Sequence, residues 1–219
     1  EKIPARQFVN SGIELSDKII LADALHTDRE LVETLEKKTP HMLTVKDNQK
    51  GLVKQLTQLF DWTEARYPEL IRSFGTLDKG HGRLEQRLIS VIATHETELL
   101  FPGINQVARL KRTREILKWG KKEEEEVFLI TNLGYDELDA EGFLRLKRAY
   151  WAIENKLHYR KDFVFGEDRS TIQAEYGPQN MSTLRNFAVG FLLANGIGNV
   201  KRCVDNLQHS TYSLLAKAA

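Results

Sequence analysis

Short apolar runs alternate with amphipathic stretches in the N-terminal part of the chain. Residues 18–25 (KIILADAL) and 41–46 (HMLTVK) are apolar runs of strand length, each bounded by polar residues. Residues 28–38 and 51–62 instead carry apolar side chains at helical spacing, with charged residues between them. This alternation of strand, helix, strand and helix predicts a parallel α/β core whose strands are buried.

The pattern changes after residue 69. Residues 84–93, 106–116 and 125–133 are strand-like runs, with many branched side chains and partial alternation of apolar and polar positions. The segment KWGKKEEEE lies between the last two runs and predicts a turn with a charge run. We interpret residues 70–134 as a mostly antiparallel β insertion in the α/β core.

Helical periodicity returns after the insertion. Residues 136–165 predict a long helix, with Asp136 or Asp139 as its cap. Its buried stripe recurs at spacings of four, three and four residues and consists of Leu146, Tyr150, Ile153 and Leu157. Residues 180–193 predict a further apolar helix. The sequence thus divides into a first part of the core (1–69), the β insertion (70–134) and a second part of the core (135–219).

Composition limits the class of protein. The chain has 219 residues, of which 41% are hydrophobic, so it can bury one core that carries an insertion. Its 32 basic and 31 acidic residues give a net charge of +1, so a nucleic-acid surface requires local segregation of charge. No apolar run approaches the roughly 18 residues of a membrane helix. The single cysteine, Cys203, and the lack of a signal peptide are typical of a cytoplasmic protein.

Two carboxylates are candidates for chemistry. Asp23 lies at the C-terminal end of an apolar strand, where open α/β sheets often place ligand-binding carboxylates. Helix capping is its alternative role, although Thr27 and Asp28 are better placed to cap the next helix. Glu154 lies at the edge of a buried stripe, and periodicity alone favours a surface glutamate there. A strand carboxylate and a helix carboxylate that the fold brings together suit Mg²⁺ (or Mn²⁺), which prefers oxygen ligands.

Basic residues concentrate in the predicted insertion. Four of them share the strand run over 106–116, and others precede and follow it: Arg83, Arg87, Arg109, Lys111, Arg112, Arg114, Lys118, Lys121 and Lys122. On one face of a strand, such residues can follow a phosphate backbone. A solvated edge strand that its charges protect from aggregation is an equal alternative. The glutamates that follow favour a salt-bridged hairpin for part of the charge.

Four stretches carry a resemblance to a known family. They are Ile19–Thr27 (IILADALHT), Leu43–Gln49 (LTVKDNQ), His81–Arg87 (HGRLEQR), and WAIENKLH followed by D-x-x-F-x-E-D. In this order and spacing they resemble the ISAs-type insertion-sequence transposases of the DDE superfamily, which include the H-repeat-associated proteins. The resemblance covers essentially the whole chain. Because Glu1 opens within a helical pattern, the chain resembles the C-terminal portion of a longer protein.

The resemblance implies part of a ribonuclease H-like core. Asp23 and Glu154 would then be the second and third catalytic carboxylates, which bind Mg²⁺ or Mn²⁺. Such an enzyme cleaves DNA at the ends of an insertion sequence and transfers the freed 3′-hydroxyl to target DNA, often as a multimer. The family's first catalytic Asp, in an Asp-Gly-Lys context, is absent from this sequence. We therefore expect the chain to be inactive alone, as a fragment or a decayed remnant.

The resemblance also implies contacts with double-stranded DNA, both at transposon ends and at the target. Lys161 follows Glu154 by seven residues, as a phosphate-contacting Lys does in related transposases, but Lys147 and Tyr150 differ from the residues expected before the glutamate. The other candidates lie on the same helix, on the turn after the second strand and at the start of the insertion: Asn155, His158, Lys46, Asn48, Gln49, His81 and Arg83. A packed helix histidine and a simple polar turn are the alternatives.

Other functions compete with a transposase. A non-catalytic DNA-binding or regulatory remnant would use the basic insertion alone, and a ribonuclease H-like nuclease of another kind would lack end-specific strand transfer. A small-molecule enzyme is disfavoured because the chain has no cofactor motif. The six histidines show no zinc-site spacing.

Overall fold

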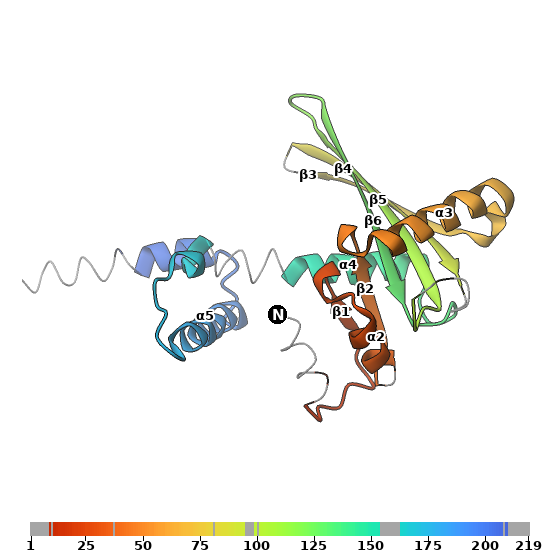
Figure 1. Ribbon diagram of the computed structural model, residues 1–219. Coiled ribbons are helices and arrows are strands. Elements are labelled where there is room, and N and C mark those ends of the chain that lie inside the picture. The colour runs from red at the N-terminus through yellow and green to blue at the C-terminus, as the bar shows by residue number, and fades with distance from the viewer. Residues whose placement is uncertain are drawn as a thin grey trace, which may run out of the picture. The chain divides into compact units, whose positions relative to one another are not determined.

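The computed structural model describes residues 9, 11–36, 38–80, 82–94, 99, 101–153, 163–207 and 209. The chain divides into two compact units, residues 1–147 and 148–219. The first unit is built on a six-stranded sheet (Figure 1). Its elements follow in this order: β1 (Ile20–Ala22), η1 (Ala24–His26), α2 (Arg29–Glu36), β2 (His41–Val45), η2 (Asp47–Gln49), α3 (Lys50–Arg66), η3 (Pro68–Leu70), β3 (Arg72–Gly80), β4 (Arg83–Ala93), β5 (Gln106–Ile116), β6 (Lys121–Thr131) and α4 (Ala140–Ile153), which continues past the boundary.

The sheet joins a parallel strand pair to an antiparallel meander. Its strand order is β1-β2-β6-β5-β4-β3. β1 and β2 are parallel, and Ile20 lies opposite His41. β2 is antiparallel to β6, and β6, β5, β4 and β3 follow with antiparallel pairing throughout. The predicted α/β class, the parallel pair and the antiparallel strands after residue 69 are confirmed, and all six strands share one sheet.

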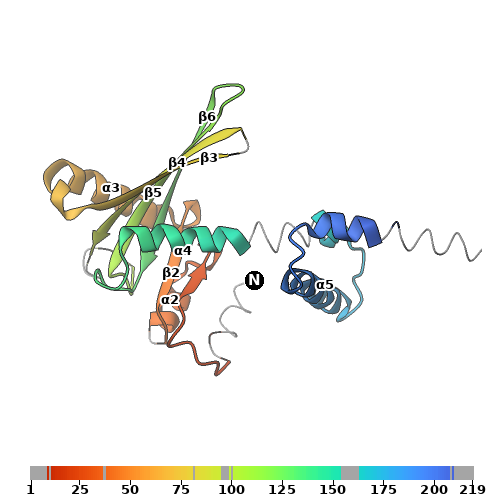
Figure 2. The same cartoon turned by 180° about the vertical axis from the view of Figure 1, so that it is seen from behind.

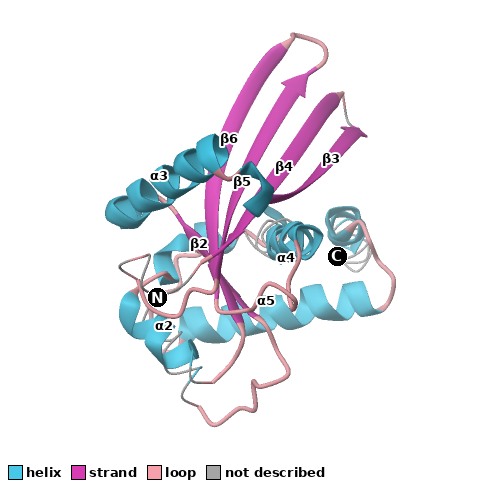
Figure 3. Ribbon diagram, turned by 90° about the vertical axis from the view of Figure 1, so that its right-hand side faces the viewer, coloured by secondary structure: helices cyan, strands magenta, loops and turns pink. Residues whose placement is uncertain are grey.

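Helices cover both faces of the sheet near the parallel pair. Side chains alternate between the two faces along a strand. Val45 of β2 belongs to the hydrophobic cluster that includes Leu31 of α2 and Leu52 of α3, whereas its neighbour Thr44 contacts Lys147 of α4. α2 and α3 therefore lie on one face and α4 on the other. Figure 2 shows α4 crossing the sheet, and Figure 3 shows α3 and α4 on either side of the strands.

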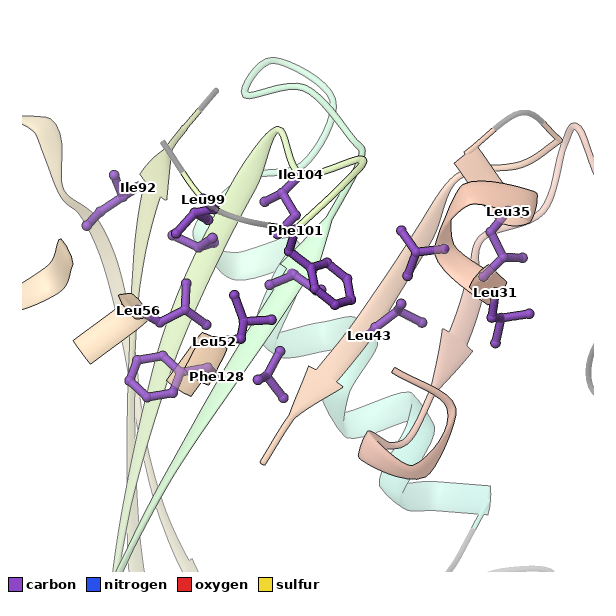
Figure 4. Packing of buried hydrophobic residues seen from close by; sticks show 14 of the residues in the cluster. Leu31, Leu35, Leu43, Leu52, Leu56, Ile92, Leu99, Phe101, Ile104 and Phe128 are labelled. Carbon is purple, nitrogen blue, oxygen red and sulfur yellow. The ribbon is translucent and has the colours of Figure 1, made fainter. Parts of the chain in front are cut away.

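A hydrophobic cluster lies between the sheet and the helices α2 and α3. Phe60 and Phe128 are buried there, with ring centroids 6.0 Å apart. Leucines from α2, β2 and α3 fill the space beside them, and Phe101 and Ile104 close it from the loop before β5 (Figure 4). Each such side chain contributes about 1.5–3 kcal/mol when it is fully buried. This packing fixes the parallel pair against the meander.

The charge run that the sequence predicts as a turn belongs to a strand instead. β6 begins at Lys121, and the turn before it is short and includes Gly120 at φ 62°. Three of the four glutamates of the run lie opposite basic residues of β5, with Glu125 in register with Arg112, and Glu124 lies opposite Thr113. Opposite charges across a ladder stabilise strand pairing, so this segment extends despite its composition.

β3 is a strand that the hydrophobic pattern does not reveal. It lies at one edge of the sheet, and most of its residues are exposed. An edge strand needs few apolar positions, because only one side of it is paired. Periodicity therefore carries little information about Arg72–Gly80.

The predicted long helix begins at Ala140. Asp139 caps it, since its Oδ1 accepts a hydrogen bond from the Gly142 N–H at 2.7 Å. The sequence predicts either Asp136 or Asp139 as the cap, and the structure shows that it is Asp139. The described helix extends to Ile153, and the part of the prediction over residues 154–162 lies outside the described residues.

The second unit is mainly helical where it is described. It contains η7 (Glu167–Arg169) and α5 (Gly177–Ala194). α5 carries a proline in its first turn and is followed by Gly196 at φ 76°, which are usual start and stop signals of a helix. The predicted helix over residues 180–193 is confirmed and begins three residues earlier.

Candidate functional site at the end of the parallel strand pair

Asp23 is the first residue after β1, at the C-terminal edge of the parallel pair. Its backbone stays extended (φ −78°, ψ 169°), and its side chain is half-buried. It makes no capping hydrogen bond to η1, whereas Asp28 Oδ1 accepts from the Leu31 N–H at 3.0 Å and caps α2. Within the described residues, no donor or cation pairs with the Asp23 carboxylate. Capping therefore does not account for Asp23.

The polar turn after β2 holds the turn that follows Asp23. Asn48 Nδ2 donates to the Ala24 carbonyl at 2.6 Å, and Gln49 Nε2 donates to the Thr27 carbonyl at 2.8 Å. Each bond contributes about 1 kcal/mol. Asn48 and Gln49, which the sequence predicts to contact DNA, thus have partners inside the protein. Lys46, just before them, is exposed.

A second polar chain joins the same turn to α4. Thr27 Oγ1 donates to the Thr44 carbonyl at 2.6 Å. Thr44 Oγ1 accepts a hydrogen bond from Lys147 Nζ at 2.8 Å, and only 3% of Lys147 is exposed. A buried amine requires such partners because desolvation penalises it. In the sequence, Lys147 stands out only as a departure from the family pattern. Its spacing could have revealed its burial, because it follows Leu144 by three residues and Phe143 by four and so lies on the same helix face.

Asp23 and α4 lie on the same face of the sheet. The register places Ala22 opposite Leu43, so Asp23 and Thr44 are the next residues along the two strands. Residues that lie opposite each other share a face, and Thr44 is on the face that α4 covers. In the described part, α4 ends at Ile153, the residue before Glu154.

Arg109 points toward α3 and is buried. Only 4% of it is exposed, and its guanidinium pairs with Asp61 Oδ1 at 3.2 Å and with Glu64. The same group lies over the ring of Phe60, 4.8 Å from the centroid. Arg109 therefore joins β5 to α3 and offers little surface to a phosphate, so its position does not support the predicted DNA contact.

Arg112 lies on the opposite face of β5, in a charge cluster around Glu85. Its Nη2 is 2.5 Å from Glu125 Oε2, and its Nε is 3.7 Å from Glu85 Oε1. Arg87 and Arg114 approach the same Glu85 oxygen at 2.8 and 3.9 Å. The expectation of a salt-bridged hairpin for part of the charge is confirmed, and Arg112 has protein partners that compete with DNA.

Lys111 and Arg83 are more accessible. Lys111 Nζ lies 3.8 Å from Glu126 Oε2, and its side chain is exposed. Arg83 is exposed at the start of β4. Among the predicted cationic DNA contacts in the described part of the chain, Lys46 and Arg83 are exposed and lie in no ion pair, whereas Lys111 is exposed but paired.

Five predicted site residues lie outside the described residues: His81, Glu154, Asn155, His158 and Lys161. Among the described residues, no group of three or more His, Cys, Asp or Glu side chains is arranged to hold a metal ion. Asp23 is therefore the one predicted metal ligand whose position is given. None of the described helices is both long and apolar enough to cross a membrane.

Comparison with known proteins finds relatives in Escherichia coli. The chain is 30% identical over 186 residues to "Putative protein YbfL" of strain K12, a match that covers 82% of this chain and 48% of that protein. It is 29% identical, with the same coverage, to "H repeat-associated putative transposase YhhI" of strain K12. It is 26% identical to "Putative transposase YncI" of strain O157:H7, over 82% of this chain and 47% of that protein. The chain spans about half the length of these curated relatives, and no protein-family profile matches it.

Proposed function

This chain belongs to the transposase family of the H-repeat-associated proteins, as its motifs predict, and we propose that it is a catalytic part of a DNA transposase. In this proposal, Asp23 and Glu154 bind Mg²⁺ or Mn²⁺ within a partial ribonuclease H-like core. The reaction is cleavage and transfer of DNA strands at the ends of an insertion sequence. We also propose that the protein acts on double-stranded DNA, both at transposon ends and at the target, and that it assembles into multimers on DNA.

The observation that carries the proposal is the state of the Asp23 carboxylate. It is half-buried at the C-terminal edge of a parallel strand pair, and no described residue neutralises it. The turn beside it is held by two side-chain amides. A fixed carboxylate without a protein partner suits a hard divalent cation, which takes oxygen ligands and water. The oxygen donor of Asp23 therefore fits Mg²⁺, and a second ligand must come from elsewhere.

Glu154 is the proposed second ligand. α4 packs on the sheet face that includes Thr44, next to Asp23 along the strand pair, and Glu154 follows the last described residue of α4. A ribonuclease H-like core is supported by the parallel pair β1–β2 and by helices on both faces of it. We also propose that residues 1–69 and 135–219 form the two parts of this core and that residues 70–134 are its β insertion. These 219 residues hold no counterpart of the family's first catalytic Asp, so catalysis in this proposal also needs a carboxylate from outside them.

The chain's own residues have separate roles in this proposal. Asp23 holds the metal, and Asn48 and Gln49 are positioning residues that fix the turn after it. A bound divalent ion would activate the attacking hydroxyl and stabilise the leaving oxygen. Exposed Lys46, at the end of β2, is placed to neutralise a phosphate near the same edge. His81, Asn155, His158 and Lys161 remain predicted DNA contacts.

Metal binding by the 219-residue chain tests the proposal directly. We expect Asp23→Asn to weaken Mn²⁺ binding, followed by electron paramagnetic resonance, by more than about tenfold. Loss of a mere supporting contact costs 10–100-fold at many metal sites, so loss of a ligand should cost at least as much. Asp47→Asn is the matched control, because Asp47 is an exposed acid on the neighbouring turn.

Equal Mn²⁺ binding by the parent chain and Asp23→Asn would contradict the proposed site. Strand cleavage is measured after an upstream segment that bears the missing Asp is restored, and Asp23→Asn should abolish it. If the restored protein binds insertion-sequence ends but does not cleave them with Mg²⁺, the non-catalytic DNA-binding remnant becomes the better interpretation.

A further inference from the structure

The two hairpins of the meander continue beyond the helices as an arm. The last buried apolar layer consists of Ile89, Leu110 and Val127, side by side on β4, β5 and β6. From there β5 continues for six residues, about 20 Å at the usual rise of a strand. Figures 1 and 3 show this arm projecting away from α3 and α4. We define the arm as residues 75–80, 82–88 and 111–126.

Charge pairs and a backbone bond hold the arm together. Three arginines of β4 and β5 surround Glu85, and Arg87 also pairs with Asp78 of β3 at 2.5 Å. At the far end, the Leu117 N–H donates to the Gly82 carbonyl at 3.0 Å, which ties one hairpin turn to the other. The two turns therefore present one continuous surface, which we call the arm tip (residues 79, 80, 82, 83 and 115–123).

The arm tip is basic although the whole chain is nearly neutral. It holds five basic residues (Lys79, Arg83, Lys118, Lys121 and Lys122) and two acidic ones (Glu115 and Glu123). Both acids are paired, at 2.9 Å for Lys121 with Glu123 and at 3.9 Å for Lys122 with Glu115. Lys79, Arg83 and Lys118 lie in no ion pair with the described residues. The pKa of Glu123 is lowered mainly by its hydrogen bond with Lys121, and the charge of Arg83 helps to lower it. The arm tip thus keeps a net positive charge toward solvent.

A tryptophan lies among these cations. Trp119 occupies the β5–β6 turn, is 72% exposed, and has Lys118 Nζ at 5.6 Å from its ring centroid. A hairpin turn does not require a tryptophan, and a ring this exposed adds little to the core. Cations beside an exposed aromatic ring are the combination that binds single-stranded nucleic acid, with phosphates on the cations and a base on the ring.

We propose that the arm tip is a DNA-binding site for a strand with unpaired bases. Lys79, Arg83 and Lys118 contact phosphates, and Trp119 stacks on a base. This site rests on the proposed function for its DNA partner, but it is remote from Asp23 in the fold. An acidic protein could also meet the cations, yet it would gain nothing from base stacking, and the experiment separates the two.

Fluorescence anisotropy with labelled DNA tests the site in the 219-residue chain. Three probes are compared: a blunt duplex, the same duplex with an unpaired thymidine tail, and the single strand. All titrations contain EDTA, so metal binding at Asp23 does not contribute. Trp119→Ala is matched with Leu77→Ala, because Leu77 is a similarly exposed apolar residue (66%) on the same arm. Lys79→Ala combined with Lys118→Ala tests the charges.

We expect Trp119→Ala to weaken binding of the tailed and single-stranded probes about 5- to 100-fold, the effect of one lost stacking contact. Binding to the blunt duplex should change less than about twofold, and Leu77→Ala should bind all three probes like the parent. The double lysine variant should weaken binding to every probe. Its salt dependence on the duplex should fall by roughly 2 in log–log slope, close to 0.9 per phosphate.

Unchanged affinity of Trp119→Ala for the tailed probe would overturn the proposal, as would equal losses in Trp119→Ala and Leu77→Ala. Absence of any DNA binding in EDTA would also overturn it, while the Mn²⁺ measurement at Asp23 would be unaffected. If Asp23→Asn binds Mn²⁺ like the parent chain while Trp119→Ala still weakens binding of the tailed probe, only the catalytic proposal is contradicted.

Discussion

Lys147 Nζ donates a hydrogen bond to Thr44 Oγ1 at 2.8 Å, across the interface between α4 and the sheet. The amine is buried, and the Thr44 carbonyl accepts a hydrogen bond from Thr27 at the turn after Asp23. The position of α4 and the conformation of that turn are therefore linked through β2. A change at Lys147 should therefore reach the turn after Asp23.

Thr44→Val should lower the free energy of unfolding by about 1–3 kcal/mol, because a buried donor loses an acceptor. Lys147→Met removes the donor and keeps most of the packing volume. The two changes combined should cost less than the sum of the single changes, by about 0.5–3 kcal/mol. Urea unfolding of the four proteins in the cycle provides the comparison. Strict additivity would show that the bond contributes nothing to stability.

Asn48→Ala should loosen the turn after Asp23 without unfolding the sheet. The Ala24 carbonyl accepts both from Asn48 and from the Thr27 N–H, at 2.6 and 3.0 Å. Loss of a bond worth about 1 kcal/mol should speed hydrogen exchange of the His26 and Thr27 amides about 2- to 10-fold. Lys46→Ala is the control, since Lys46 is exposed and makes no side-chain bond to the turn. Equal exchange in both variants would argue that Asn48 serves DNA alone.

Removing the charge of Arg109 and removing its acidic partners should lower the free energy of unfolding by different amounts. Arg109→Met removes a buried cation and leaves Asp61 and Glu64 solvated, which should cost about 1–3 kcal/mol. Asp61→Asn combined with Glu64→Gln leaves the guanidinium buried and unpaired, which should cost about 3–5 kcal/mol. Lys111→Met, on the same strand but exposed, should change stability by less than about 0.5 kcal/mol. Thermal or urea unfolding ranks the three variants, and a reversed order would exclude a structural role for the Arg109 pairs.

His41 should make the protein less stable in acid. Burial lowers the pKa of His41 below its ordinary value of 6.5, and a hydrogen bond with the Thr39 carbonyl opposes this shift. The unfolded chain therefore binds the proton more readily than the folded protein does. The contribution of His41 to stability is complete above about pH 6.5 and is lost as the pH falls through the lower, folded-state pKa.

His41→Leu should therefore flatten the decline in stability between about pH 7 and pH 5. The slope can decrease by at most about 1.4 kcal/mol per pH unit, the linkage limit for one proton. Urea midpoints across this range, for the parent and the variant, give both slopes. Parallel curves would mean that carboxylates alone cause the acid sensitivity.

Local patterns predicted the elements whose periodicity and burial agree. β2 and α3 are apolar on the side that the fold buries, so their existence follows from spacing. α4 instead buries Phe143, Leu144 and Lys147, whereas Leu146 and Tyr150 of the predicted stripe are only partly buried. The position of Asp23 is also predictable from local sequence, because ligand-binding carboxylates generally lie at the C-terminal edge of parallel strands. β3 and the start of β6 escaped prediction, because their stability comes from neighbouring strands and from charges across the ladder.

Side-chain roles depended on contacts that no local pattern contains. Asn48 and Gln49 look like a polar turn, and their partners lie 24 and 22 residues away. Arg109 and Arg112 belong to one basic run, yet strand alternation sends them to opposite faces. The sequence contains that alternation but does not say that α3 covers the face of Arg109.

The pairing of β2 with β6 also implies an order of assembly. Thr131 Oγ1 donates to the His41 carbonyl across 90 positions of sequence, whereas β3, β4 and β5 each pair with the next strand along the chain. Contacts between distant segments form late, because the intervening loop must first be closed. On the ribosome, β1 and β2 would emerge long before β6, the antiparallel partner of β2, is synthesised. The edge that includes Asp23 would thus be completed last, on a meander that already presents its arm.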